Sequence, residues 1–347
     1  MTALALYAST LNHAVRRLDR AVLVITGLFL AMLIAMPLPA VRESLEFTLS
    51  SMTGIAPFLL ASAIAAAWLT AAGADKVIGR VFQGHWLVMI GMAALFGSLS
   101  PFCSCGVIPI IAALLAAGAP LPAVMAFWLS SPIMDPEIFM LTAGGIGLEF
   151  AIAKTIAAFV IGILGGLGTH VVQFSGWFSA PLREQVSSCG TCQPRISSDK
   201  VHWAFWKNSD RLESFRTTVT WTLLFLGKWL LLAFLLESLM VRYVPPELIG
   251  QWLGGDSAWA LPLAVAAGVP AYLNSYVAIP LIAGLLDSGM APGPALGFMT
   301  AGAITSIPAA VAVFALVRKP VFLWYVGLAV VGSLLTGQAY QIYTTGL

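Results

Sequence analysis

The stretch that decides the fold is PFCSCGVIPIIAALLAAGAPLPAVMAFWLSSP (residues 101–132), which has a counterpart in PAYLNSYVAIPLIAGLLDSGMAPGPALGFMTAGA (residues 270–303). Both stretches are apolar, and proline and glycine interrupt them at corresponding places. Allowing one-residue gaps, the matched pairs are Pro109 and Pro280, Gly118 and Gly289, Pro120 and Pro292, Pro122 and Pro294, and Phe127 and Phe298. Sequences rich in Gly, Pro and Ala can align by chance, but the agreement in spacing favours an internal duplication.

The composition indicates whether water or lipid surrounds this protein. Of 347 residues, 59% are apolar and only 9% are charged, and the mean hydropathy is +0.92. A soluble domain carries about 25% charged residues. So few charges cannot cover a water-facing surface, so we expect a lipid bilayer around the chain. The net charge of +2 and the scattered basic residues indicate no nucleic-acid partner.

Apolar segments of spanning length predict about nine membrane crossings, at roughly 20 residues each. Two of these segments, 85–113 and 257–286, are long enough to be broken helices. Three arginines precede the first segment without a clear cleavage site after it, which favours a retained helix over a signal peptide. The segments are residues 21–39, 53–73, 85–113, 121–143, 149–170, 217–240, 257–286, 293–317 and 321–340.

A polar stretch divides the chain. We expect a first transmembrane half at residues 1–170, a polar connecting loop with a CxxC element at 171–216, and a second transmembrane half at 217–347. The positive-inside rule and the count of crossings disagree on which side of the membrane this loop lies, so its side stays open. The predicted fold is an all-α, polytopic transmembrane bundle of two homologous halves, with Pro- and Gly-broken helices meeting near the midplane. Such paired breaks are typical of the binding sites of transporters.

The first predicted break lies in Ser-Pro-Phe-Cys-Ser-Cys-Gly-Val-Ile-Pro, residues 100–109. Proline removes a backbone donor and clashes with the preceding turn, and glycine tolerates unusual dihedral angles. Backbone freed in this way must lie inside protein or beside a watery cavity. We therefore expect a helix break formed by Pro101, Gly106 and Pro109.

Two thiols and a hydroxyl lie at this break, on Cys103, Ser104 and Cys105. Thiolates bind soft ions such as Cu(I), Zn(II) or trivalent metalloids, and two side chains at i and i+2 can converge across a tight turn. These residues are candidates for substrate binding. The alternative is that both cysteines pack as small apolar residues.

The corresponding break in the second half contains Pro270, Asn274, Tyr276 and Pro280. Asn274 and Tyr276 offer hydrogen bonds where the first half offers thiols, and they are candidates for the same substrate site. The alternative is that they are polar contacts between helices.

Two acids, Asp135 and Glu137, lie in an apolar stretch interrupted by Pro132 and Pro136. An acid inside the membrane is costly unless it is paired or hydrated, and it indicates function by default. Both are candidates for proton coupling. The alternative is an interfacial turn, where acids cost little. Near other helix ends, we expect Lys154 and Lys228 to reach the interface.

The polar stretch contains a second thiol pair, Cys189 and Cys192. It is a candidate for metal or metalloid docking, or for a redox-active dithiol. Because no second CxxC is present, a complete zinc site is not expected. The sequence also lacks a GxxxxGK[ST] phosphate loop, a Ser/His/Asp constellation and an HExxH motif, so we expect neither an enzyme nor a resident cofactor.

The element PFCSCGVIP, followed by an apolar helix, a Gly/Pro turn and a Phe-bearing helix ending in Ser-Pro, resembles the predicted-permease family that includes bacterial organoarsenical efflux permeases (ArsP-like, YraQ-like). The resemblance covers roughly residues 50–340. It implies a multi-pass permease of the bacterial inner membrane that exports a small thiophilic solute, such as a trivalent organoarsenical, through paired thiols. Cys103 and Cys105 stand at the matching positions.

An alternative to the permease is a membrane thiol-redox protein that relays reducing equivalents between Cys103/Cys105 and Cys189/Cys192. The sequence leaves the substrate, the direction of transport, the coupling ion and the oligomeric state open.

Overall fold

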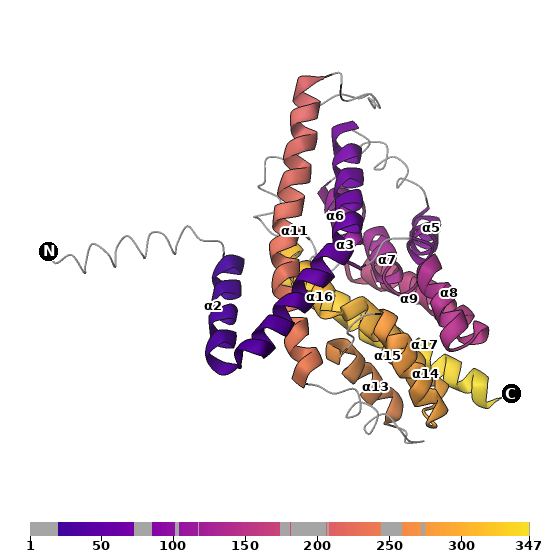
Figure 1. The fold of residues 1–347 in the computed structure, drawn as a ribbon. Helices are drawn as coiled ribbons and strands as arrows, with labels where there is room; N and C mark the ends of the chain where they lie inside the picture. Colours follow the sequence, from indigo (N-terminus) through magenta and orange to yellow (C-terminus); the bar gives the residue numbers. More distant parts are fainter. Residues whose placement is uncertain are drawn as a thin grey trace.

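A computed structural model of the chain consists of α-helices joined by short turns in the part that it describes (Figure 1). The described residues are 20–72, 85–100, 104–116, 118–173, 181, 206, 208–243, 259–271 and 275–346. The predicted all-α bundle is therefore confirmed.

Two sets of helices follow the N-terminal helix α2 (Arg20–Ala35), and the second set repeats the order of the first. The first set is α3 (Leu38–Ala72), α5 (Trp86–Ser98), α6 (Ser104–Ala116), α7 (Leu121–Ser130), α8 (Pro136–Gly145) and α9 (Leu148–Val172). The second set is α11 (Ser209–Tyr243), α13 (Ala260–Ala271), α14 (Ser275–Asp287), α15 (Pro292–Thr305), α16 (Ile307–Leu316) and α17 (Lys319–Thr345).

A constant spacing relates the two sets. The helices α3 and α11 begin at Leu38 and Ser209, which are 171 positions apart. The same spacing separates the first residues of α6 and α14, of α7 and α15, of α8 and α16, and of α9 and α17. The duplication predicted from two short stretches therefore extends over both sets of helices.

The equivalent helices α3 and α11 pack against each other in opposite directions. At one end, the Arg211 guanidinium of α11 donates to the carbonyl of Ala71 at the end of α3, at 2.8 Å. At the other end, Arg242 of α11 pairs with Glu43 near the start of α3, at 2.7 Å between Nη1 and Oε2. The two contacts fix the pair as antiparallel, as the ribbon also shows (Figure 1).

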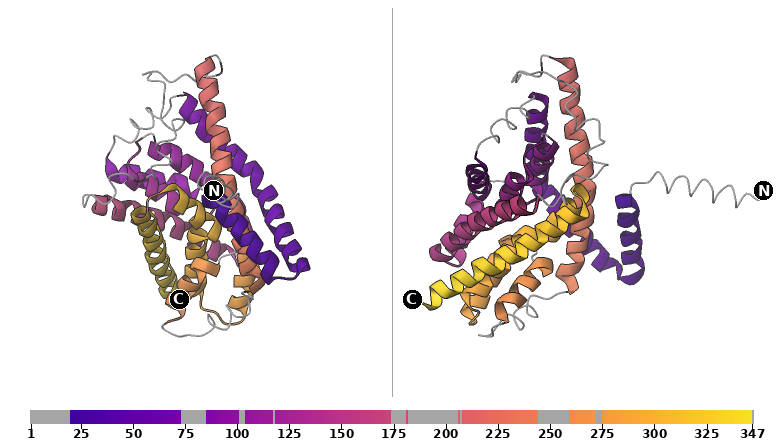
Figure 2. Two further views of the ribbon diagram at one scale, coloured as in Figure 1. Left: turned by 90° about the vertical axis from the view of Figure 1, so that its left-hand side faces the viewer. Right: turned by 180° about the vertical axis from the view of Figure 1, so that it is seen from behind.

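The last helices of the two sets, α9 and α17, are antiparallel as well (Figure 2). Phe150 near the start of α9 meets Tyr340 near the end of α17, with ring centroids 5.8 Å apart. The Trp324 indole near the start of α17 donates to Thr169 Oγ1 near the end of α9, at 3.0 Å. Because equivalent helices run in opposite directions, the two sets form an inverted repeat about a two-fold axis perpendicular to these helices.

Three described helices are long and apolar enough to cross a membrane without interruption: α9, the Ser209–Leu239 part of α11, and α17. Two bent pairs add further spans if each pair is one crossing, namely Leu38–Pro57 with Leu59–Trp68, bent by 43°, and Pro292–Thr305 with Ala309–Leu316, bent by 44°. The expected segments 85–113 and 257–286 are indeed each divided into two helices.

The expectation of a continuous helix over 293–317 is wrong, because α15 ends at Thr305 and α16 begins at Ile307. Ser306 between them has extended backbone, with φ −48° and ψ 146°. Pro308 is the second residue of α16, where its missing N–H costs little, and a proline disfavours continued helix before it. The break occupies the place that residues 131–135 hold between α7 and α8.

The matched glycines of the two repeats form the same turn. Gly118 ends α6 and Gly289 ends α14 with positive φ angles, 81° and 96°. Each turn has the same two backbone hydrogen bonds, in which Gly118 and Ala119 donate to Leu115 and Leu114, and Gly289 and Met290 donate to Leu286 and Leu285. Glycine adopts this conformation without steric cost, and the prolines that follow open the next helix.

Glycine also allows a close helix crossing at equivalent positions of the two repeats. A Cβ atom on Gly97 of α5 would lie 2.7 Å from the Phe127 carbonyl oxygen of α7. A Cβ atom on Gly268 of α13 would lie 2.6 Å from the Phe298 carbonyl oxygen of α15. Small residues allow such close backbone approach between membrane helices.

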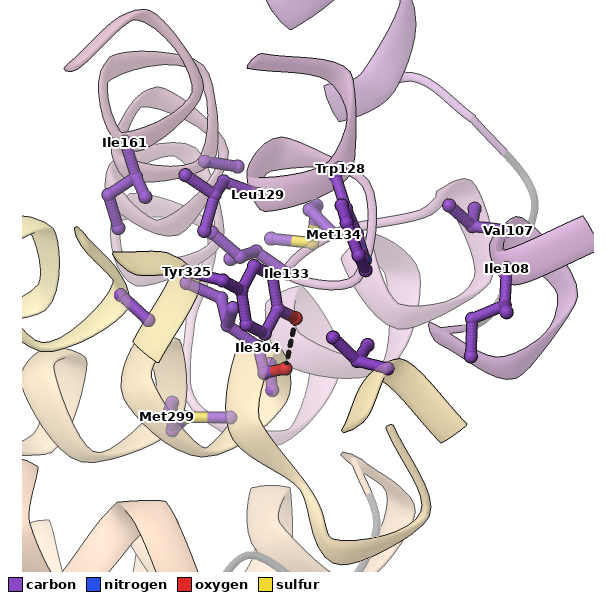
Figure 3. Packing of buried hydrophobic residues seen from close by; sticks show 14 of the residues in the cluster. Val107, Ile108, Trp128, Leu129, Ile133, Met134, Ile161, Met299, Ile304 and Tyr325 are labelled. Carbon is purple, nitrogen blue, oxygen red and sulfur yellow. Dashed lines mark hydrogen bonds between the residues drawn. The ribbon is translucent and has the colours of Figure 1, made fainter. Parts of the chain in front are cut away.

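Side chains of both repeats form one central hydrophobic core (Figure 3). Trp128 of α7 and Tyr325 of α17 are among its largest fully buried side chains, with ring centroids 4.9 Å apart. The core continues to Val107 and Ile108 in the first turn of α6, and to Ala278 and Ile279 in the first turns of α14. The repeats therefore share a core.

The predicted division at residues 171–216 lies largely outside the described residues. Helix α9 ends at Val172, and α11 begins at Ser209, eight positions before the predicted start of the second half at residue 217. Arg211 lies in this additional turn, where its contact with Ala71 holds α11 to α3.

Candidate functional site

The predicted cysteine break lies between α5 and α6. Helix α5 ends at Ser98 and α6 begins at Ser104. Pro101 and Cys103 lie outside the described residues, whereas the backbone of Ser104, Cys105 and Gly106 forms the first turn of α6. The Cys-Ser-Cys element therefore joins a helix break to a helix N-terminus.

The second break occupies the equivalent position in the inverted repeat. Helix α13 ends at Ala271 and α14 begins at Ser275. Asn274 lies outside the described residues, and Tyr276 is the second residue of α14, as Cys105 is the second residue of α6. By the spacing of 171 positions, Cys103 corresponds to Asn274, Ser104 to Ser275 and Cys105 to Tyr276.

The structure places four of the predicted break residues in helices. Gly106 and Pro109 lie inside α6, Pro280 lies inside α14 and Pro270 lies near the end of α13. The first break precedes Gly106 and Pro109. The second break follows Pro270 and precedes Pro280. A proline early in a helix removes one hydrogen bond but does not prevent the turns on either side from forming.

Pro109 and Pro280 each remove one backbone hydrogen bond beside a break. Each is the sixth residue of its helix, so each should have donated to the carbonyl four residues earlier. Because proline has no N–H, the carbonyls of Cys105 and Tyr276 lose this donor. Two matched backbone acceptors are thus left beside the two breaks, where they can bind a solute or water.

The helices that follow the two breaks each pack on the opposite repeat. Helix α6 packs on α16, and α14 packs on α8. A Cβ atom on Gly145, the last residue of α8, would lie 2.7 Å from Ile279 of α14. The prediction that the breaks themselves meet depends on residues 101–103 and 272–274, which lie outside the described residues.

A third break separates α7 from α8 and contains the predicted acids. The side chain of Asp135 caps α8, because its Oδ1 accepts a hydrogen bond from the Ile138 amide at 2.7 Å. Glu137 lies in the first turn of α8 and is exposed. Both positions favour a negative charge, since the helix dipole is positive at its N-terminus. Asp135 thus has a structural role whether or not it carries protons.

One charged residue of this region was misread from the sequence. Lys154 of α9 does not reach the interface: its side chain is completely buried. Its Nζ atom has no hydrogen-bond partner among the described residues, and nor does the buried Oγ of Ser131 at the end of α7. The signal for this burial was the helical period, which places Lys154 on the same face as Ala151, Ala158 and the other buried residues of α9.

The equivalent of Lys154 in the second repeat is Tyr325, 171 positions later. Tyr325 is also completely buried, but its hydroxyl donates to the carbonyl of Ile304 at 2.6 Å (Figure 3). Ile304 lies at the end of α15, just before the break at Ser306. A buried polar side chain therefore reaches a helix break in the second repeat, which was not predicted from the sequence.

The described residues contain no group of three or more His, Cys, Asp or Glu that could hold a metal ion. Cys189 and Cys192 lie outside the described residues.

An inverted repeat with matched helix breaks defines the class of this protein, a polytopic membrane transporter. The chain belongs to the predicted permease family, ArsP_1, which matches residues 40–342. The match includes both sets of helices. The family supports a permease that moves a solute across a lipid membrane rather than an enzyme.

Two curated relatives are similar to this chain. The UPF0718 protein MJ0584 of Methanocaldococcus jannaschii is 22% identical over 327 residues, covering 79% of this chain and 90% of the relative. The UPF0718 protein YcgR of Bacillus subtilis is 32% identical over 96 residues, covering 28% of this chain and 33% of the relative. No solved structure matches this chain.

Proposed function

We propose that this protein is a secondary exporter of a small thiophilic solute, such as a trivalent organoarsenical, in the bacterial inner membrane. The observation that carries the proposal is the position of the Cys-Ser-Cys element at one of two equivalent helix breaks in an inverted repeat. In transporters of this type, the solute binds near the midplane where the repeats meet. We further propose that residues 1–170 and 217–347 act as two halves joined by 171–216.

In this proposal Cys103 and Cys105 bind the solute as thiolates, which prefer soft metalloids over hard ions. Ser104, Asn274 and Tyr276 complete the site with hydrogen bonds. The matched carbonyls freed by Pro109 and Pro280 support the same location. Cys189 and Cys192 serve at most as an accessory docking site for the metalloid.

Proton coupling is assigned to the acids at the α7–α8 break, Asp135 and Glu137. Asp135 is half-buried at the N-terminus of α8, and Glu137 is exposed. Because it is the less exposed of the two acids, Asp135 is favoured over Glu137 for coupling.

The test is uptake of trivalent methylarsenite into everted inner-membrane vesicles that contain the protein. Cys103→Ser and Cys105→Ser should each abolish uptake, because one thiolate cannot hold the solute. Val107→Ala, two positions further along α6, is the matched control for packing and should retain uptake. Full uptake by the Cys103→Ser/Cys105→Ser protein would assign the cysteines to packing and overturn the proposed site.

A further inference from the structure

Lys154 is a fully buried charged side chain of the described core. It lies on the buried face of α9, which packs against α5, α7, α8, α15 and α17. Its Nζ atom finds no hydrogen-bond acceptor among the described residues. A buried ammonium without a partner is strongly unfavourable in a low-dielectric interior. This arrangement therefore suits a lysine that has released its proton.

The surroundings of Lys154 offer one counter-charge. Helices α5, α7 and α15 carry no Asp, Glu, Lys, Arg or His among their residues. Helix α8, which packs on α9, contributes its cap Asp135 and the exposed Glu137. The remaining titratable side chains on α9 and α17 are Glu149, His170, Lys319, Tyr325, Tyr340 and Tyr343.

The inverted repeat indicates where Lys154 can find a partner. Its equivalent, Tyr325, donates to the carbonyl of Ile304 at the α15–α16 break. The residue that corresponds to Ile304 is Ile133, which lies in the α7–α8 break two positions before Asp135. If the first repeat adopts the arrangement that the second has here, Lys154 reaches the carbonyl of Ile133, two positions before the carboxylate of Asp135. Inverted-repeat transporters alternate access by moving one repeat or bundle against the other.

We propose that Lys154 carries the proton in the transport cycle, and that Asp135 takes part in the coupling as the counter-charge of Lys154 in the alternate conformation. The buried position described here, without a hydrogen-bond partner, favours release of the proton. When the α7–α8 break opens to water, the amine takes a proton from hydronium and the resulting ammonium pairs with Asp135. When the break closes, the ammonium returns the proton to water on the other side. This inference rests on the proposed export function.

The experiment uses the full-length protein in proteoliposomes with a trapped pH dye and trivalent methylarsenite as the probe. The wild type should move protons when methylarsenite is added. Lys154→Met should lose this solute-driven proton movement to the level of empty liposomes, and Lys154→Arg should lose it too, because arginine keeps its proton. The matched control is Lys228→Met, which removes a half-buried lysine lying over the Phe225 ring of α11 and should behave as wild type.

A second measurement decides the inference without transport. Stability rises with pH wherever the unfolded state binds more protons than the folded state. The wild type should therefore resist unfolding in detergent more strongly at pH 9 than at pH 6, and Lys154→Met should lose that pH dependence. Asp135→Asn keeps the helix cap and tests the counter-charge.

The outcomes distinguish the proposed role of Lys154 from the proposed export function. Methylarsenite-driven proton movement by Lys154→Met at the wild-type level overturns the role of Lys154 and leaves export intact. Failure of the wild type to transport methylarsenite overturns the proposed substrate. In that case, an unfolding profile of Lys154→Met that keeps the wild-type pH dependence also overturns the inference, and loss of the dependence supports it.

Discussion

Replacing Gly97 or Gly268 by alanine tests the inverted repeat, because each glycine allows two helices to cross closely at equivalent positions, α5 with α7 and α13 with α15. A favourable contact with a carbon atom needs about 3.5 Å. The new Cβ atoms would lie 2.7 Å from the Phe127 carbonyl and 2.6 Å from the Phe298 carbonyl, so each helix pair must separate by nearly 1 Å. Backbone oxygen cannot rotate away, unlike a side-chain end. Overpacking of this kind costs about 1–3 kcal/mol.

We expect both variants to lose free energy of unfolding, and Gly97→Ala to lose more, because its Cβ atom would also collide with Ser130 Oγ. Gly91→Ala is the matched control, since it lies on the same helix α5 as Gly97 and its Cβ atom would meet nothing within 4 Å. In the control, alanine should be neutral or stabilise the helix by up to ~1 kcal/mol. The assay is reversible unfolding in mixed detergent micelles. Wild-type stability of both Gly97→Ala and Gly268→Ala would refute the close crossings.

Two further predictions concern the thiols and the acids. Cys189→Ser/Cys192→Ser should leave methylarsenite transport in vesicles largely intact and change the apparent affinity more than the maximal rate. An inactive double variant would instead support the redox relay, if either single variant also traps a disulfide with Cys103 or Cys105. Asp135→Ala should lower the free energy of unfolding by about 0.5–2 kcal/mol because the cap of α8 is lost, whereas Asp135→Asn should keep the stability; transport by Asp135→Asn at the wild-type rate would exclude a need for the charge.

The sequence predicted the breaks and the duplication because their causes are local. Gly118 and Gly289 adopt a positive φ angle, which favours glycine. Proline favours the start of a helix, so the starts of α7 and α15 can be recognised from the sequence. The direction of the second repeat has no local cause. It is set by tertiary contacts between distant residues, such as Arg211 with Ala71 and Arg242 with Glu43, which no periodicity shows.

The site was predicted less completely than the fold. Distance from the helix end suggested that Lys154 reaches the interface, but α8 and α17 cover that end of α9, so distance along the chain was the wrong measure. Tyr325 could not be singled out, because a buried tyrosine is ordinary until its acceptor at a helix break is known. The prolines were recognised as breakers, but their effect on carbonyls one turn earlier depends on where the helix begins.

The two repeats share their backbone and differ in chemistry at equivalent positions. Where the first repeat has Cys103, Cys105, Asp135 and Lys154, the second has Asn274, Tyr276, Ser306 and Tyr325. Three of these pairs stand between two helices or at the start of the helix that follows, and Tyr325 of the fourth pair reaches the carbonyl of Ile304 beside a break. A shared scaffold gives the two repeats equivalent motions, which alternating access requires. On the proposed function, the first repeat then binds the soft solute and the proton, and the second contributes neutral hydrogen bonds. Exchanging the chemistry of one pair, as in Lys154→Tyr, should therefore preserve the fold while removing coupling.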